Sequence, residues 1–210
     1  MTDSAKSRNA ESVNQTQVPQ LRTAGEPDAD DLTAMLSGLT DLSLYFRFQT
    51  AIGRPPRQAL VLRMLCPSGR AWVATRDDRI VGHAMWAWTG PASDRTVELA
   101  AIISEGEQRR GLGVRMLSVA AADATAAGAT RFLFVVSPAN DRTIRMIRRR
   151  WPTAAVERDG TLLNFLVPAR SAHTSEERAD VVDEQVGRLE CGEVSAAGEL
   201  RPLDDVVPAI

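Results

Sequence analysis

The 210-residue sequence predicts a single α/β domain built on a mixed β-sheet. Segments with the periodicity of helices and of strands alternate along the chain. One strand–helix–strand unit, residues 96–136, requires a right-handed crossover and therefore a parallel strand pair. The other strands are joined so that antiparallel pairing is expected. With 44% hydrophobic and 25% charged residues, the composition is globular and excludes a collagen-like or wholly disordered chain.

The first part of the domain is expected to contain one strand and two helices. Residues 18–23 form a short strand. Residues 27–39 form a helix, because apolar residues recur at helical spacing after Asp28, a suitable N-cap. Residues 41–48 are aromatic and dense in apolar side chains, and no element is assigned to them. Residues 55–66 form the second helix, with a proline pair at its start.

A hairpin and a central strand follow. Residues 71–75 and 80–88 are strands joined by the turn at residues 77–78. Gly90 and Pro91 then interrupt the chain. Residues 96–104 are strongly apolar and form the first strand of the parallel pair.

The last part of the domain contains two helices and three strands. Residues 111–127 form a helix that ends at Gly128. Residues 131–136 are an unbroken apolar run, as a buried parallel strand should be. Residues 140–150 form a helix. A final hairpin joins strands at residues 154–157 and 161–167 around Asp159 and Gly160. The predicted order is β-α-α-β-β-β-α-β-α-β-β.

Two tails are expected to flank a domain of residues 18–168. Residues 1–17 are polar and residues 169–210 are acidic, and both are expected to be disordered. Ten acidic and three basic residues lie from residue 171 onward, a net charge of −7. Because the whole chain carries −2, residues 19–170 carry +5. A basic domain suggests an anionic ligand, whereas the tail is equally explained as a solubilising segment.

Several classes of protein are excluded by what the sequence lacks. Cys66 and Cys191 lie far apart, so no disulfide framework is expected, and a reducing cytoplasm is the expected compartment. His83 and His173 also lie far apart in the sequence, so no metal site is expected. No apolar run reaches the roughly 18 residues that a membrane span needs, and no membrane partner is expected.

The most informative segment is residues 97–113, where an apolar strand leads through a polar turn into a helix. Gly111 and Gly113 allow the backbone to approach a ligand, and the free N–H groups at a helix start attract anions. Arg109 and Arg110 add positive charge. A dinucleotide fingerprint is rejected because Met116 replaces its third glycine, and the segment has no lysine for a nucleoside-triphosphate loop.

The remaining pattern, Gln-x-x-Gly-x-Gly, is formed by Gln108, Gly111 and Gly113. It resembles the [QR]-x-x-G-x-[GA] signature of the GNAT-type N-acetyltransferases, which lies between a central strand and a helix. The stretch that begins at Asn140 resembles a second segment of that family. Residues 43–48 resemble a segment of its bacterial protein-lysine acetyltransferases. The resemblance covers residues 18–167 and neither tail.

The resemblance implies a GNAT-like fold, acetyl-CoA as donor, a primary amine as acceptor and no metal. In the family, the two parallel strands splay apart and the pantetheine arm lies between them. The acceptor is a protein lysine or a small amine. The residues implied to contact coenzyme A are Ala101, Ile102, Ile103, Gln108, Arg109, Arg110, Gly111, Leu112, Gly113 and Asn140.

Glu98 is the implied general base, since it matches the position of the glutamate of the protein-lysine acetyltransferases. A carboxylate among apolar neighbours is poorly solvated and favours its neutral form, which suits a base. The alternative is that Glu98 points to solvent at the end of the sheet. Glu105 and Glu107 are second candidates, although acidic residues of such a turn are more often only solvated.

Two features depart from the family pattern. The helix of residues 140–150 lacks the tyrosine that often protonates the leaving thiolate, and Trp151-Pro152 replaces the usual Gly-Phe. These departures keep a second hypothesis open, a non-catalytic acyl-CoA-binding sensor or interaction module. The arginines of the same helix are interpreted as a solvated face, because no aromatic residues interleave for stacking on nucleic acid.

Overall fold

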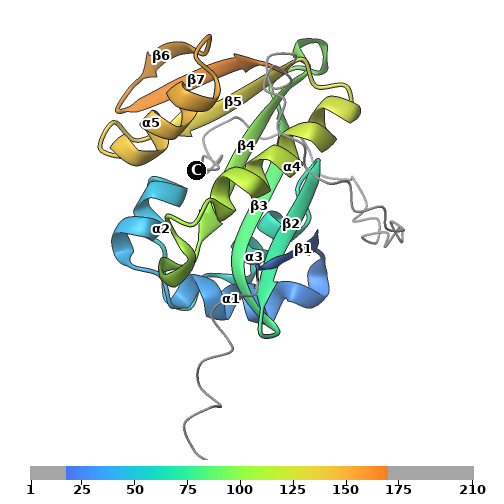
Figure 1. The fold of residues 1–210 in the computed structure, drawn as a ribbon, viewed down its shortest axis with the longest axis vertical. Helices are drawn as coiled ribbons and strands as arrows, with labels where there is room; N and C mark the ends of the chain where they lie inside the picture. Colours follow the sequence, from blue (N-terminus) through green and yellow to red (C-terminus); the bar gives the residue numbers. More distant parts are fainter. Residues whose placement is uncertain (1–17, 170–210) are drawn as a thin grey trace, which may run out of the picture.

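The structure is a computed structural model that describes residues 18–169. Its centre is a seven-stranded sheet with the order β1-β2-β3-β4-β5-β7-β6 (Figure 1). All neighbouring strands are antiparallel except β4 and β5. This confirms the predicted mixed sheet with one parallel pair. The predicted tails lie outside the described residues, apart from Ala169, which is buried and donates a hydrogen bond to the carbonyl of Thr130 at 2.9 Å.

The strands occupy the predicted places with small shifts. Their bounds are β1 Gln20–Thr23, β2 Arg70–Arg76, β3 Arg79–Thr89, β4 Thr96–Ile103, β5 Arg131–Val136, β6 Ala155–Asp159 and β7 Leu162–Pro168. Both turn residues between β2 and β3, Asp77 and Asp78, have positive φ, which is the geometry of a tight two-residue hairpin. The β6–β7 turn lies one residue later than predicted, at Gly160 and Thr161.

The described residues form five α-helices, and three of them precede the glycine turn, where two were predicted. Their bounds are α1 Ala29–Ser37, α2 Asp41–Phe48, α3 Gln58–Leu65, α4 Leu112–Ala126 and α5 Asp141–Arg150. The short 3₁₀ helices are η1 Glu26–Asp28, η2 Ala92–Asp94 and η3 Glu105–Glu107. The predicted order therefore lacked α2, and the helix expected over residues 55–66 begins only at Gln58 because Pro55 and Pro56 precede it.

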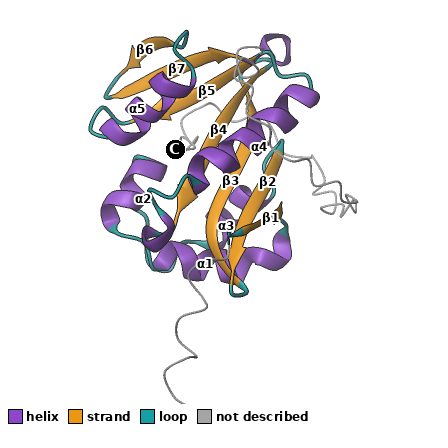
Figure 2. Cartoon of the chain, viewed as in Figure 1, coloured by secondary structure: helices purple, strands orange, loops and turns teal. Residues whose placement is uncertain are grey.

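The helices form two layers on the sheet (Figure 2). Helix α4 covers one face, and its core continues to α5 through Ile147 and Trp151. The core under α1, α2 and α3 lies on the other face and includes Ile102 of β4. Asp28 precedes α1 as predicted, but its carboxylate accepts from the Gly25 N–H and from Arg22 rather than capping that helix.

Side chains of β4 alternate between these two cores. Val97 and Leu99 join the core under α4, whereas Ala100 and Ile102 pack on the opposite face. Because successive strand side chains point to opposite faces, Glu98 shares a face with Ala100 and with the helix α2 side of the sheet. The central strand therefore presents its carboxylate away from α4.

Candidate active site

Strands β4 and β5 pair only at their beginnings. The parallel ladder consists of Thr96 with Arg131, Val97 with Phe132 and Glu98 with Leu133. Beyond that last pair, β4 continues to Ile103 along β3, and β5 continues to Val136 along β7. The two central strands therefore diverge, as Figure 1 shows, and leave the facing backbone edges without ladder partners. Three of the predicted contact residues, Ala101, Ile102 and Ile103, lie on the diverging part of β4.

The predicted anion-binding turn lies at the end of this divergence. Gly111 is the N-cap of α4 and has a φ of 81°, and among the described residues no side chain caps this helix. Arg109 has a φ of 66°, and it and Arg110 are exposed beside the turn. Free backbone N–H groups, the positive end of a 15-residue helix and two guanidinium groups thus lie together.

The first turn of α4 fixes this geometry. Leu112 is buried and anchors the helix start in the core. A Cβ added at Gly113 would lie 3.5 Å from Cγ1 of Ile103, so the helix lies close to the end of β4 at this point. The predicted residues from Gln108 to Gly113 are therefore gathered around one exposed turn.

Gln108 ties the turn to three other elements. Its Nε2 donates to the carbonyl of Ile103 at 3.1 Å and to Oγ of Ser43 at 3.4 Å. Its Oε1 accepts from Nη1 of Arg142 at 3.0 Å. The glutamine side chain thus connects the end of β4 with α2 on one side and α5 on the other.

Glu105 caps α2 from across the fold. Its Oε1 accepts from the Thr40 N–H and hydroxyl and from the Ser43 hydroxyl, at 3.2, 2.8 and 2.7 Å. Partial burial opposes ionisation of Glu105, but these hydrogen bonds outweigh it and lower its pKa. Its carboxylate is committed to holding α2, so it is a poor general base.

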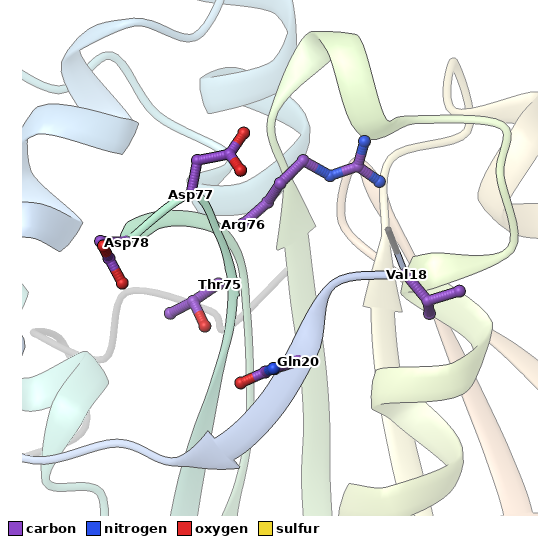
Figure 3. A pocket seen from close by; sticks show the side chains of 6 residues that line it. All are labelled: Val18, Gln20, Thr75, Arg76, Asp77 and Asp78. Atoms are coloured by element: carbon purple, nitrogen blue, oxygen red, sulfur yellow. The ribbon is translucent and has the colours of Figure 1, made fainter. Parts of the chain in front are cut away.

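Glu107 is buried rather than solvated, contrary to the expectation for acidic residues of this turn. Its Oε2 lies 3.1 Å from Nη2 of Arg76 and 3.8 Å from Nη1 of Arg110. Arg76 also lines a pocket of about 260 Å³ at the β2–β3 turn, together with Gln20, Asp77 and Asp78 (Figure 3). The Arg76–Glu107 ion pair attaches the glycine turn to the β2–β3 hairpin.

Glu98 lies at the point where the strands separate. It belongs to the last pair of the β4–β5 ladder, and only 9% of its surface is exposed. The alternative that it points into solvent is therefore wrong. Its charge acts on Arg47 of α2, a side chain that is itself 3% exposed.

Sequence reasoning missed Arg47 as a site residue. Helix α2 begins with Thr40 as N-cap, whose Oγ1 accepts from the Ser43 N–H at 3.1 Å. Leu44 and Phe48 lie one helical turn apart and face the core. Arg47, which directly precedes Phe48, is therefore buried on the side of α2 that faces the sheet. The Thr40 cap followed by this apolar spacing was the signal for the helix.

Asn140 is buried at the N-cap of α5. Its Oδ1 accepts from the Thr143 N–H at 3.1 Å. This capping bond explains its position at the end of β5 without a ligand, and its contact with coenzyme A stays a prediction. Helix α5 carries Met146 and Ile147 on its inner side and no tyrosine.

A second pocket of about 240 Å³ opens on the Glu98 face of the sheet. Thr96 and Leu133 line it, and these residues flank Glu98 along β4 and across the ladder. The pocket also holds the carboxylates of Asp94 and Glu157. Asp94 is paired with Arg131 at 3.2 Å.

A comparison with protein-family models identifies the chain. The model described as "Acetyltransferase (GNAT) family" matches residues 41–150, more than half of the sequence. The chain belongs to the GNAT acetyltransferase family. No curated protein matches it in a sequence search.

Solved GNAT structures share the fold. The GNAT domain of S. lividans PAT has a TM-score of 0.64 at 21% identity, with 71% of this chain and 90% of that chain covered. A phosphinothricin acetyltransferase from Sinorhizobium meliloti in complex with AcCoA has a TM-score of 0.59 at 18% identity, covering 79% and 96%. YncA, a putative acetyltransferase from Salmonella typhimurium with acetyl-CoA, has a TM-score of 0.57 at 16% identity, covering 80% and 100%.

Residues 18–169 lack two other features, a membrane-spanning helix and a cluster of metal-ligating side chains. No helix within this range is long and apolar enough to span a membrane. No group of three or more potential metal-ligating side chains occurs in the same range.

Proposed function

We propose that this GNAT protein transfers the acetyl group of acetyl-CoA to a primary amine, with Glu98 as the general base. The observation that carries the proposal is the divergence of β4 and β5 directly after Glu98, which opens toward the uncapped start of α4. A thioester tail laid along β4 would end near Glu98 when its phosphates rest at the glycine turn.

The residues of the turn fit a diphosphate. The N–H groups from Gly111 onward are not capped by any described side chain, and Arg109 and Arg110 are exposed around them. Charge-assisted hydrogen bonds to backbone N–H groups are among the stronger ones in proteins. The fit rests on the backbone conformation, because the positive φ of Gly111 turns the chain into the helix.

The bound donor supplies an activated carbonyl whose C–S bond breaks as the amine nitrogen forms the new C–N bond. The carboxylate of Glu98 removes the proton that the amine must lose, directly or through a water molecule. A backbone N–H on the unpaired edge of β4 polarises the carbonyl. Alignment on a rigid strand contributes much of the remaining rate enhancement.

The acceptor enters from the second pocket in this proposal. That pocket adjoins Glu98 and is lined by Asp94, Arg131 and Glu157; because Asp94 is paired with Arg131, Glu157 is the negative charge that attracts a protonated amine. Its open form suits a lysine side chain of a protein as well as a small amine. Helix α2 has exposed Leu42 and Tyr45, and this apolar surface favours a protein lysine as the acceptor.

The test combines a binding and a turnover measurement. Calorimetry measures acetyl-CoA affinity, and release of the free thiol reports turnover against small amines and lysine-containing proteins. We expect E98Q to lose turnover with acetyl-CoA affinity nearly unchanged. E105Q is the matched control, because a glutamine there can still accept the Thr40 and Ser43 hydrogen bonds, and we expect it to remain active.

The second candidate function, a non-catalytic acyl-CoA sensor, is favoured by the absence of a tyrosine on α5. Tight acetyl-CoA binding without turnover on any amine or protein would support it. Full turnover by E98Q at neutral pH would instead show that Glu98 is not the general base, but it would not contradict the proposed transferase activity.

A further inference from the structure

Helix α2 buries a charged side chain on the sheet face that carries Glu98. Nη2 of Arg47 donates to Sδ of Met85 at 3.5 Å, and its guanidinium lies 5.1 Å from the ring centre of Phe48. In the sheet register, Met85 lies opposite Ala100 and Ala87 lies opposite Glu98. Arg47 therefore contacts β3 at Met85, which lies two residues before the position opposite Glu98 and on the same face of the sheet.

The burial of Arg47 has a cost that packing alone does not explain. Only 3% of the residue is exposed, and its Nε is buried without a hydrogen-bond partner among the described residues. Removing a guanidinium from water costs several kcal/mol, and a leucine or methionine would fill this space without that cost. The arginine must therefore have a compensating interaction.

The charge of Glu98 supplies one. Burial lowers the pKa of Arg47 to about 10, and the negative charge of Glu98 opposes this effect. Arg47 thus remains protonated at neutral pH. The Arg47–Glu98 interaction links α2, the one α-helix of the described residues absent from the sequence prediction, with the proposed base.

Apart from Glu157, the other charged groups described near this face are neutral or already paired. His83 of β3 has its pKa lowered to about 3 by burial and then by Arg47, so it is uncharged at neutral pH. Asp28, which lies beyond His83, is paired with Arg22 at 2.6 Å. At the other end of the face, Arg131 is paired with Asp94, and Glu157 lies across the second pocket.

We propose that Arg47 is a positioning residue that keeps Glu98 ionised and fixed on β4, so that Glu98 can accept a proton at neutral pH. The inference rests on the proposed role of Glu98 as base. A buried carboxylate by itself favours its neutral form and would be occupied by a proton before the amine arrives. A cation beside it reverses that preference.

The decisive experiment compares pH profiles of kcat/KM. In R47M, which keeps the volume but removes the charge, the acid limb moves upward by about one to three pH units, the range for a nearby opposite charge. At a pH below the new limb, activity falls about tenfold to thousandfold and recovers as the pH rises. Acetyl-CoA affinity stays within twofold, because the contacts of Arg47 are with Met85 and Phe48 and not with the glycine turn.

Two variants separate charge from packing. R47K keeps the positive charge, and its acid limb stays near that of the unmodified protein. M85L removes the sulfur acceptor of Arg47 but leaves both charges, and its limb does not move. A purely structural role for Arg47 predicts equal losses at every pH in R47M and R47K, and that result would overturn the proposal.

E98Q distinguishes failure of this proposal from failure of the proposed function. An inactive E98Q with an unshifted R47M profile refutes the Arg47 proposal and leaves Glu98 as base. An active E98Q refutes the base itself. If R47M melts too readily for kinetics, R47M/E98Q should melt at a higher temperature than R47M, because the buried carboxylate that has lost the charge of Arg47 is then also removed. A double variant no more stable than R47M would also overturn the proposal.

Discussion

Replacing Gly111 by alanine isolates the contribution of the glycine turn to coenzyme A binding. A Cβ at this position meets no protein atom within 4 Å, so the variant introduces no clash in the free protein. The φ of 81° remains, and an L-residue in the left-handed region is strained by about 1–2 kcal/mol. For a domain of this size, that strain lowers the melting temperature by roughly 2–8 °C.

The effect on binding is expected to be larger than this strain. In the proposed binding mode, the added methyl group lies where the diphosphate approaches the N–H groups of the α4 start, so at least one charge-assisted hydrogen bond is lost. Such a bond contributes about 1.5–3 kcal/mol, which corresponds to an affinity loss of roughly tenfold to more than a hundredfold. Calorimetry with coenzyme A measures this change directly.

Gly160 provides the matched control. It also has positive φ, at 56°, and a Cβ there also meets no atom within 4 Å, but it lies in the β6–β7 turn. G160A should lose a similar amount of stability and bind coenzyme A normally. Pantetheine, which lacks the diphosphate, should inhibit both variants equally. Equal coenzyme A affinity in G111A and G160A would refute the placement of the diphosphate at the α4 start.

Two further predictions concern the stability of the scaffold. Burial lowers the pKa of His83 to about 3 in the folded protein, so between about pH 6.5 and pH 3 the unfolded chain binds a proton that the folded protein does not. The melting temperature should therefore decline as the pH falls through this range. In H83Q, a plot of melting temperature against pH should show a smaller decline. Asp123 of α4 accepts a hydrogen bond from Nε1 of Trp86 at 2.8 Å and pairs with Arg70 at 2.7 Å. In urea unfolding, D123A should lose about 1–3 kcal/mol of the free energy of unfolding, with unchanged coenzyme A affinity. A D123A variant as stable as the original protein would refute the stabilising role of these contacts.

The sequence predicted the elements whose signals are local. The hairpin turn at Asp77 and Asp78 and the helix end at Gly128 follow from residues that tolerate positive φ, and all three adopt it. The apolar runs of β4 and β5 are buried from both sides and so appear as continuous hydrophobic segments. The glycine turn between them could also be recognised from a local signal, because its own glycines indicate the backbone conformation that it adopts.

Helix α2 escaped prediction because its stabilising contacts come from distant parts of the chain. The Thr40 cap and the apolar spacing were only a weak local signal, and a helix of eight residues is marginal without packing. Its capping oxygens come partly from Glu105, which follows β4, and its apolar side faces a core shared with α1 and α3. The predicted solvation of Glu107 was wrong for a related reason, because its partner Arg76 lies on the hairpin.

The same argument explains why the chemistry of Glu98 could be read only in part. The sequence shows that the residue lies in an apolar strand, which predicts burial, and burial alone would favour a protonated carboxyl. Its charged neighbour becomes visible only when the sheet register places Met85 opposite Ala100, on the Glu98 face, and Arg47 of α2 contacts Met85 there. If Arg47 were simply a packing residue, its buried Nε would remain an unexplained cost. As the counter-charge of a base, it makes the apolar setting of Glu98 compatible with accepting a proton.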